Sequence, residues 1–216
     1  MNARPCPRLT RRLARTWAEV DRAFSARIDG LPPDEFFCRN GCFGCCLGLF
    51  ALPLPEALAV RAACRGLPAP VRRVTRERAE RAALRSAVLF PGDPASGLLD
   101  PNRSEEADER YFESVAAVAC PVLDLPSGVC RVYEARPLIC RTYGLAIRNV
   151  SGLAAEACPL SFPGGAAERA LDTAFDAAEL LALDQAVAEA AFADGLPAGA
   201  ETTLAHVLAG TGRAWG

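Results

Sequence analysis

The chain has 216 residues, of which 51% are hydrophobic and 23% charged, and its 24 basic and 26 acidic side chains give a net charge of −2. These proportions predict a folded domain with a buried core and exclude a disordered chain. All of the basic residues are Arg, and His206 is the single His. The lack of Lys excludes a P-loop, a Schiff-base lysine and a PLP anchor, and a single His excludes a pair of catalytic histidines or a His-rich metal site. Ten cysteines carry the remaining chemical signal.

The distribution of charged and apolar residues predicts a cytoplasmic protein. A secretory leader needs an uninterrupted apolar stretch of about 7 to 15 residues, whereas arginines are scattered over residues 4–27. The longest uncharged runs, 42–55 and 115–123, are shorter than the roughly 18 apolar residues of a membrane-spanning helix, so we expect no membrane segment. The net charge predicts no nucleic-acid partner, and the basic stretch Arg72–Arg85 is expected to be a solvated helix face.

The first predicted element is an amphipathic helix over residues 7–29. Its apolar residues recur at steps of three or four, and Gly30 and Pro32 end it. The Arg-rich opposite face is expected to be in water. A mitochondrial presequence or a nucleic-acid-binding arm is the alternative, but Glu19 and Asp21 argue against a presequence, and we interpret the segment as a packing helix.

Three more helices and a loop are predicted between residues 55 and 119. Helices are expected over 55–65 and 70–90, the second ending at Pro91-Gly92. Residues 91–104 contain three prolines and two glycines, which predicts an exposed connection rather than a domain boundary. A helix over 105–119 follows.

A short β-hairpin is predicted next, because the segments 122–123 and 129–133 flank the turn Pro126-Ser127-Gly128. No strand is expected after this hairpin. A helix that begins at Pro137, followed by Ala-rich helices over 166–194 and 201–209, completes the chain.

These elements predict a mostly α fold, a small helical bundle around a Cys-rich metal site with a short β-hairpin. We expect a single cysteine-cluster metal-binding domain over residues 1–216 with its core motif region at 36–160. The N-terminal helix and the C-terminal Ala-rich helices are expected to pack on that region.

Eight of the ten cysteines fall in two clusters. The first is a Gly-rich turn with the spacing Cys-x3-Cys-x2-Cys-Cys, and the second follows much later in the chain; the members are Cys38, Cys42, Cys45, Cys46, and then Cys120, Cys130, Cys140 and Cys158. Thiols persist in a reducing cytosol, and both zinc sites and iron–sulfur clusters use thiolates, so we interpret all eight as metal ligands rather than as a disulfide framework. The two clusters must then meet in space, at an entropic cost that grows only with the logarithm of the loop length.

The other two cysteines, Cys6 near the terminus and Cys64 in an amphipathic helix, are assigned no ligand role, because an isolated buried cysteine behaves as a small apolar residue. Side chains of neighbouring residues diverge. Cys45 and Cys46 are therefore expected to serve different metal ions, unless only one of them is a ligand.

Arginines flank the ligand segments at positions 39, 131, 136 and 141. Thiolates gathered around metal ions leave an excess of negative charge, which hydrogen-bond donors or cations must offset. We predict that Arg136 and Arg141 donate hydrogen bonds to metal-bound sulfur, a role that would also tune an iron cluster. Ordinary surface solvation is the alternative for all four.

Two stretches carry a family pattern. The first is Cys38-Arg-Asn-Gly-Cys42-Phe-Gly-Cys45-Cys46, and the second runs from Cys120-Pro through Cys130-Arg-Val-Tyr133 to Arg136-Pro137-Leu-Ile-Cys140-Arg141. Together they resemble the bacterial YkgJ-like cysteine-cluster family of zinc- or iron-chelating CxxCxxCC proteins. The later stretch matches the family pattern, whereas the first has one extra residue between Cys38 and Cys42. The resemblance covers about residues 36–160 and implies a metal-chelating role for Cys42, Cys45, Cys46, Cys120, Cys130, Cys140 and Cys158. It implies no settled reaction.

Several functions fit these residues. The leading hypothesis is a metal-binding protein that holds zinc or an iron–sulfur cluster in a structural, redox-sensing or metal-sensing role. The alternative is an iron–sulfur-dependent modifying enzyme, since flagellin lysine methylases resemble the chain in their cysteine pattern; a metal-delivery protein is a third class. The spacing Cys-x3-Cys-x2-Cys also occurs in radical-SAM enzymes, but the chain lacks the repeated strand–helix units of their barrel.

An enzyme would differ from a structural site by an open metal coordination position beside a pocket. Acid–base candidates near the ligand segments are Glu56, Glu134, Tyr133 and Tyr143, each of which can also be a helix-end charge or a packed aromatic. Thiolates suit zinc and iron alike. The adjacent cysteines and the intervening arginines favour an iron–sulfur cluster over Zn²⁺.

Overall fold

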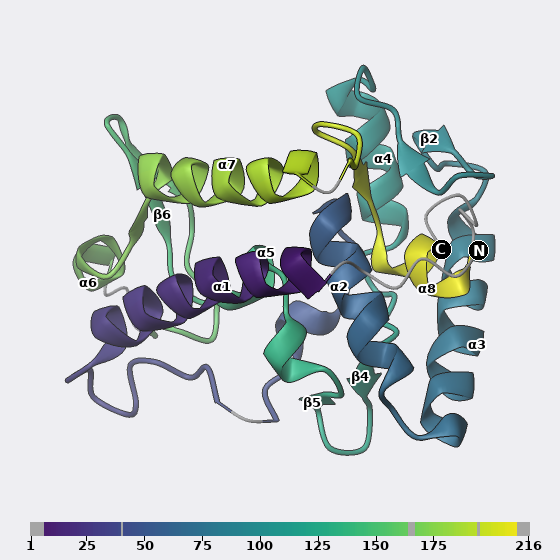
Figure 1. The fold of residues 1–216 in the computed structure, drawn as a ribbon. Coiled ribbons are helices and arrows are strands. Elements are labelled where there is room, and N and C mark those ends of the chain that lie inside the picture. The colour runs from purple at the N-terminus through teal and green to yellow at the C-terminus, as the bar shows by residue number, and fades with distance from the viewer. Residues whose placement is uncertain (1–6, 40, 164–166, 194, 211–216) are drawn as a thin grey trace.

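The computed structural model describes residues 7–39, 41–163, 167–193 and 195–210. In this part of the chain, eight α-helices form the larger share of the regular structure, and short strands lie in the segments between them (Figure 1). The predicted mostly α class is confirmed. None of the described helices combines the length and the apolar character that a membrane crossing requires.

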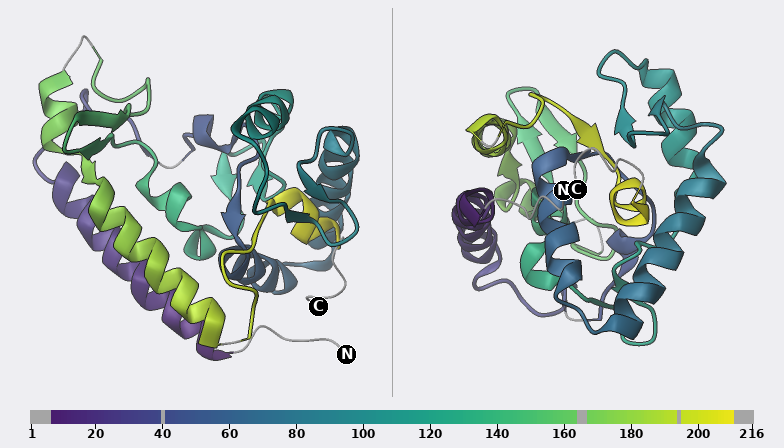
Figure 2. Two further views of the ribbon diagram at one scale, coloured as in Figure 1. Left: turned by 90° about the horizontal axis from the view of Figure 1, so that it is seen from above. Right: turned by 45° about the vertical axis from the view of Figure 1, so that its right-hand side comes forward.

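The N-terminal helix α1 (Pro7–Ile28) has nearly the predicted bounds. Its apolar residues Leu9, Leu13, Trp17 and Val20 are buried, because residues three and four apart share one face of a helix. This face packs against α7 (Ala177–Ala193) and α5 (Leu138–Thr142). The two long helices α1 and α7 lie side by side along their length (Figure 2).

Helix α2 (Leu54–Arg65) lies between the α1–α7 pair and α8 (Leu204–Ala209) and contacts all three. Helix α3 (Ala69–Ser86) packs along α8. Helix α4 (Glu105–Ser114) contributes the buried side chain of Tyr111 to a hydrophobic cluster that it shares with α3 and α8. Both α3 and α4 end about a turn earlier than predicted. The hydroxyls of Ser86 and Ser114 donate to backbone carbonyls of the last turn, and such bonds compete with the backbone hydrogen bonds of a helix.

The segment 91–104 connects α3 to α4 and is largely exposed, as predicted, but the prediction of a loop is wrong, because the segment forms a hairpin of β2 (Gly92–Asp93) and β3 (Leu98–Leu99). The Asp93 carboxylate accepts hydrogen bonds from the amides of Ala95 and Ser96, which closes the turn. Strand β3 pairs with β9 (Glu201–Thr202), which pairs with β1 (Leu52–Pro53) in a four-stranded sheet. Strands of two residues are too short to show an alternating pattern.

The expectation that no strand follows the hairpin is also wrong. Strands β6 (Ile147–Asn149) and β7 (Gly152–Ala155) pair antiparallel, and β8 (Phe175–Asp176) pairs with β6 in parallel. The described part of the segment 166–194 is therefore two helices, α6 (Ala167–Asp172) and α7, with β8 between them. Burial of the Phe175 side chain against α1 overrides the helical propensity of the Ala-rich sequence.

The hairpin and helix predicted for the later cysteine cluster are confirmed. Strand β4 (Leu123–Asp124) pairs antiparallel with β5 (Val129–Cys130). The short 3₁₀ helix η2 (Tyr133–Ala135) follows, and α5 begins directly after Pro137.

Candidate metal centre

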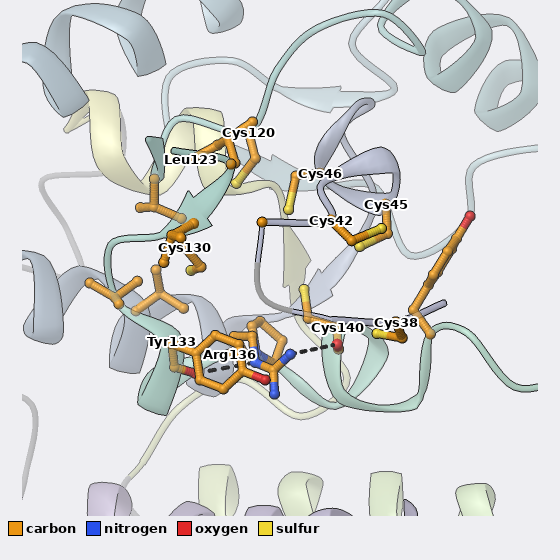
Figure 3. A pocket seen from close by; sticks show the side chains of 18 of the residues that line it. Cys38, Cys42, Cys45, Cys46, Cys120, Leu123, Cys130, Tyr133, Arg136 and Cys140 are labelled. Atoms are coloured by element: carbon orange, nitrogen blue, oxygen red, sulfur yellow. Dashed lines mark hydrogen bonds between the residues drawn. The ribbon is translucent and has the colours of Figure 1, made fainter. Parts of the chain in front are cut away.

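Seven of the eight clustered cysteines line one cavity of about 500 Å³, which we call the cysteine cavity: Cys38, Cys42, Cys45, Cys46, Cys120, Cys130 and Cys140. Figure 3 shows these side chains around a common space. Most of the remaining wall is apolar, from valines and leucines of α2, α8 and the hairpin. No carboxylate or imidazole is part of this lining within the described residues. The cavity therefore offers sulfur as its principal side-chain donor.

Tight turns place the thiols of the first cluster. The amide of Cys42 donates to the carbonyl oxygen of Arg39 over 2.9 Å, and the amide of Cys46 donates to that of Phe43 over 2.8 Å. The segment ends in the 3₁₀ helix η1 (Gly44–Cys46). Successive turns of this kind bring several side chains of a short segment to one side of the backbone.

Backbone contacts join the two cysteine-bearing segments directly. The amide of Cys120 donates to the carbonyl oxygen of Cys46 over 2.7 Å. Gly41 and Gly128 both have positive φ, and a Cβ added to Gly128 would lie 2.5 Å from the carbonyl oxygen of Gly41. Glycine at position 128 is thus required both by its backbone conformation and by the close approach of the first loop to the hairpin.

The later cysteines come from three consecutive elements. Cys120 is buried just before β4, Cys130 lies on β5, and Cys140 lies on α5. The guanidinium of Arg78, on α3, donates to the carbonyl oxygens of Cys120 and Leu123 and so anchors this segment to the helical layer.

The other cysteines lie elsewhere. Cys158 is not part of the lining of the cysteine cavity; its amide donates to the carbonyl oxygen of Gly144, and it lies near enough to Cys38 to act on that thiol electrostatically. Cys64 is buried on α2 and also lies outside the lining. Cys6 is outside the described residues. The nine cysteines of the described residues are free thiols.

Burial decides the ionisation of most of these thiols. It raises the pKa of Cys120 to about 11 and that of Cys140 well above the ordinary value of 9.0, since a charged thiolate loses its hydration in an apolar wall. Burial also raises the pKa of Cys130 and Cys38. A hydrogen bond between the adjacent thiols of Cys45 and Cys46 lowers the pKa of Cys45 to about 7 and raises that of Cys46. The Cys45 thiol therefore ionises more readily than those of Cys46, Cys120, Cys130 and Cys140, and metal binding must displace protons from these four.

Arg136 is one of two arginines that line the cysteine cavity within the described residues. Its guanidinium lies 3.6 Å from the ring centroid of Tyr133, and its Nε donates to the carbonyl oxygen of the same residue over 3.2 Å (Figure 3). The positive charge lowers the pKa of several cavity thiols, among them Cys45 and Cys140, against the effect of burial. Arg39 also belongs to the lining.

Arg141 lies outside the lining and is buried. Its guanidinium donates to the carbonyl oxygens of Arg136 (2.7 Å) and Glu134 (2.6 Å) and forms an ion pair with Asp21 of α1. The side chain therefore positions the backbone that carries Arg136. The guanidinium of Arg131 contacts Asp124 and Thr75.

The acid–base candidates separate into two groups. Tyr133 and Tyr143 line the cysteine cavity, with 51% and 43% of their surface exposed, whereas Glu56 and Glu134 do not line it. Glu56 is 1% exposed and accepts hydrogen bonds from Trp17 Nε1 (2.7 Å) and from the amide of Leu138 (2.9 Å), the first residue of α5. Burial raises the pKa of Glu56 to about 7. The residue thus joins α1, α2 and the helix of Cys140, a role that the sequence does not indicate.

The thiols are spread around the cavity wall and do not form a closed set of metal ligands among the described residues. In the described ranges, no three or more His, Cys, Asp or Glu side chains form a set that could hold one ion as they stand. The thiols line the walls of a hollow instead of meeting at one point. An all-sulfur lining fits zinc and iron–sulfur centres, which both take thiolate ligands.

Comparison with known protein families matches residues 37–159 to the CxxCxxCC family, described as "Putative zinc- or iron-chelating domain". The match spans more than half of the chain and includes all eight clustered cysteines, so the chain belongs to this family of metal-chelating domains. Comparisons with curated proteins and with solved structures found no match.

Proposed function

We propose that the protein binds an iron–sulfur cluster in the cysteine cavity through thiolates of the two cysteine clusters. The ligands are drawn from the seven thiols that line the cavity, Cys38, Cys42, Cys45, Cys46, Cys120, Cys130 and Cys140. Cys158, which lies near Cys38, is a further candidate ligand. The observation that carries the proposal is the convergence of seven thiols from separate elements on one cavity whose lining holds no other soft donor among the described residues. The membership of a zinc- or iron-chelating family supports metal binding by these cysteines.

The size of the cavity favours a polynuclear centre over one zinc ion. A structural zinc site is closed by four ligands at about 2.3 Å from the metal. The thiols here surround a hollow of about 500 Å³, which leaves room for several metal ions and bridging sulfides. Arg136 supplies positive charge, and hydrogen bonds and charge near cluster sulfurs set the potential of such centres.

An accessible centre favours a redox- or metal-sensing role over a purely structural one. Cys38 is exposed, and Tyr133 and Tyr143 are about half exposed, so the cavity is lined in part by groups that solutes can reach. The same opening supports the second candidate function, an iron–sulfur-dependent modifying enzyme, which requires a pocket beside the metal.

Anaerobic purification followed by metal analysis, acid-labile sulfide analysis and an absorption spectrum tests the proposal. We expect a brown protein with stoichiometric iron and sulfide. Colourless protein with bound zinc would overturn the cluster and leave a zinc centre.

A matched pair of variants tests the ligand assignment. Cys140→Ser should lower the metal content strongly, whereas Cys64→Ser, which changes another buried thiol outside the cysteine cavity, should leave it unchanged. Equal metal content in both variants would contradict the assignment.

A further inference from the structure

A second pocket, of about 410 Å³, lies between α2 and the first half of α3. Five of the residues that line it are arginines, Arg61 and Arg65 on α2 and Arg72, Arg73 and Arg76 on α3, and no acidic residue is part of its described lining. We call it the arginine pocket. The basic stretch 72–85 is therefore not uniformly a solvated face, because its first half borders a hollow that α2 completes.

Helical spacing explains why the arginines meet. Residues 61 and 65 are four apart on α2, and on α3 residue 76 follows residue 72 by four positions and residue 73 by three, so each set occupies one side of its helix. Arg72 donates to the carbonyl oxygens of Arg65 (3.2 Å) and Leu67 (2.9 Å), which ties the start of α3 to the end of α2. The orientation of the two faces toward each other is thus maintained by hydrogen bonds.

The side chains behind the arginines close the pocket on its inner side. Cys64, Thr75 and Leu208 line it and are buried, with Thr75 2% exposed. The Thr75 hydroxyl accepts a hydrogen bond from Arg131, at 3.5 Å. The arginines therefore surround a concave site with a floor, rather than lying along a flat surface.

The pocket gathers positive charge from two helices. Arg73 and Arg76 form ion pairs with Glu77 and Glu80, but these pairs are exposed and lie along one helix, a geometry that contributes little. Burial and the charge of Arg65 lower the pKa of Arg61, which is the effect expected where like charges are crowded. Helix α3 adds to the positive potential, since its first turn has no acidic residue and no capping side chain.

We infer that the arginine pocket binds a small anion that carries two or more phosphate groups. Guanidinium groups match phosphate oxygens in a two-point geometry, and several of them around one concave site can contact more than one phosphate at once. The size of the pocket is in the range of sites for small molecules. The net charge of −2 argues against an extended nucleic-acid surface. This inference does not rest on the function proposed for the cysteine cavity.

Isothermal titration calorimetry of the full chain with inorganic pyrophosphate at low salt tests the inference. We expect one site per chain, and weaker binding of orthophosphate than of pyrophosphate. The double variant Arg65→Gln/Arg76→Gln should weaken pyrophosphate binding by at least about tenfold, because two charge-assisted contacts are lost.

The matched control is Arg81→Gln/Arg85→Gln, which makes the same charge change on the same helix at exposed positions outside the lining. It should retain affinity within about twofold, and circular dichroism should show the wild-type helix content in both variants. Absence of pyrophosphate binding by the wild type would overturn the inference. Equal weakening in both double variants, or displacement of pyrophosphate by a short oligonucleotide at a much lower phosphate concentration, would also overturn it.

Discussion

The amide of Cys120 donates a hydrogen bond to the carbonyl oxygen of Cys46 over 2.7 Å, and this bond joins the two cysteine clusters through the backbone. An isolated bridge between Leu47 and Ala119 extends the same contact. The two clusters are thus held together by the polypeptide itself. A metal centre in the cysteine cavity would add to a framework that the backbone already defines.

The contact between Gly128 and Gly41 should be essential to that framework. Gly128→Ala places a Cβ 2.5 Å from the Gly41 carbonyl oxygen and also requires an alanine with a left-handed φ, so we expect the free energy of unfolding to fall by about 3 kcal/mol. Gly30→Ala has a similar φ with open space around the new Cβ and should cost only about 1 kcal/mol. Urea unfolding of both variants provides the measurement, and similar losses in the two would contradict the proposed close approach.

Glu56 should make stability depend on pH between about 4.5 and 7. Its pKa is raised by burial to about 7 in the folded chain from an ordinary value of 4.5, so the folded state binds the proton more tightly. The contribution of this group is fully present below pH 4.5 and is lost as the pH rises through about 7, at most about 3 kcal/mol in total. The nearby charges of Asp184 and Arg141 act on it in opposite directions.

The variant Glu56→Gln retains an oxygen that can accept from Trp17 and Leu138 but does not titrate. Urea unfolding at a series of pH values should show a flatter profile for the variant over this window. Parallel profiles for the wild type and the variant would show that the carboxyl group does not cause the dependence.

His206 should have the opposite dependence on pH. Burial lowers its pKa to about 4 from 6.5, because the ring, which lies beside Phe90 and contacts the Thr203 hydroxyl, is held away from water. Its contribution to stability is present above pH 6.5 and is lost as the pH falls through about 4. NMR titration of the single imidazole in the folded chain measures this pKa directly. A value near 6.5 would contradict the prediction.

Arg136 should control how readily the cavity thiols lose their protons. Its charge lowers the pKa of Cys45 and Cys140, so Arg136→Gln should shift the ultraviolet titration of the thiols, and the pH at which metal binds, upward. Arg110→Gln removes the same charge from an exposed position on α4 and should leave both curves unchanged. A shift of the same size in the two variants would indicate a general charge effect and would contradict a specific role for Arg136.

Local sequence patterns predicted those elements that are long or marked by turn residues. The spacing of Leu9, Leu13 and Trp17 predicted α1 within a residue or so of its bounds, and Pro126-Ser127-Gly128 predicted the β4–β5 hairpin. The strands at 92–99 and 147–155 were missed because each is only two to four residues long, too short for an alternating pattern, and because β3 and β6 also pair with β9 and β8, which are distant in sequence. Local periodicity contains no information about such pairing.

The sequence by itself determined the class of donor and the family membership through the spacing of cysteines and glycines, and the mostly helical fold through the periodicity of apolar residues. These properties depend on residue type and on order along the backbone. Only the tertiary structure decided which thiols share the cysteine cavity, that Arg136 rather than Arg141 lies in its wall, and that Glu56 supports the helix of Cys140. Those outcomes depend on contacts between residues that are distant in sequence, and such contacts follow from how complete helices and strands pack against one another.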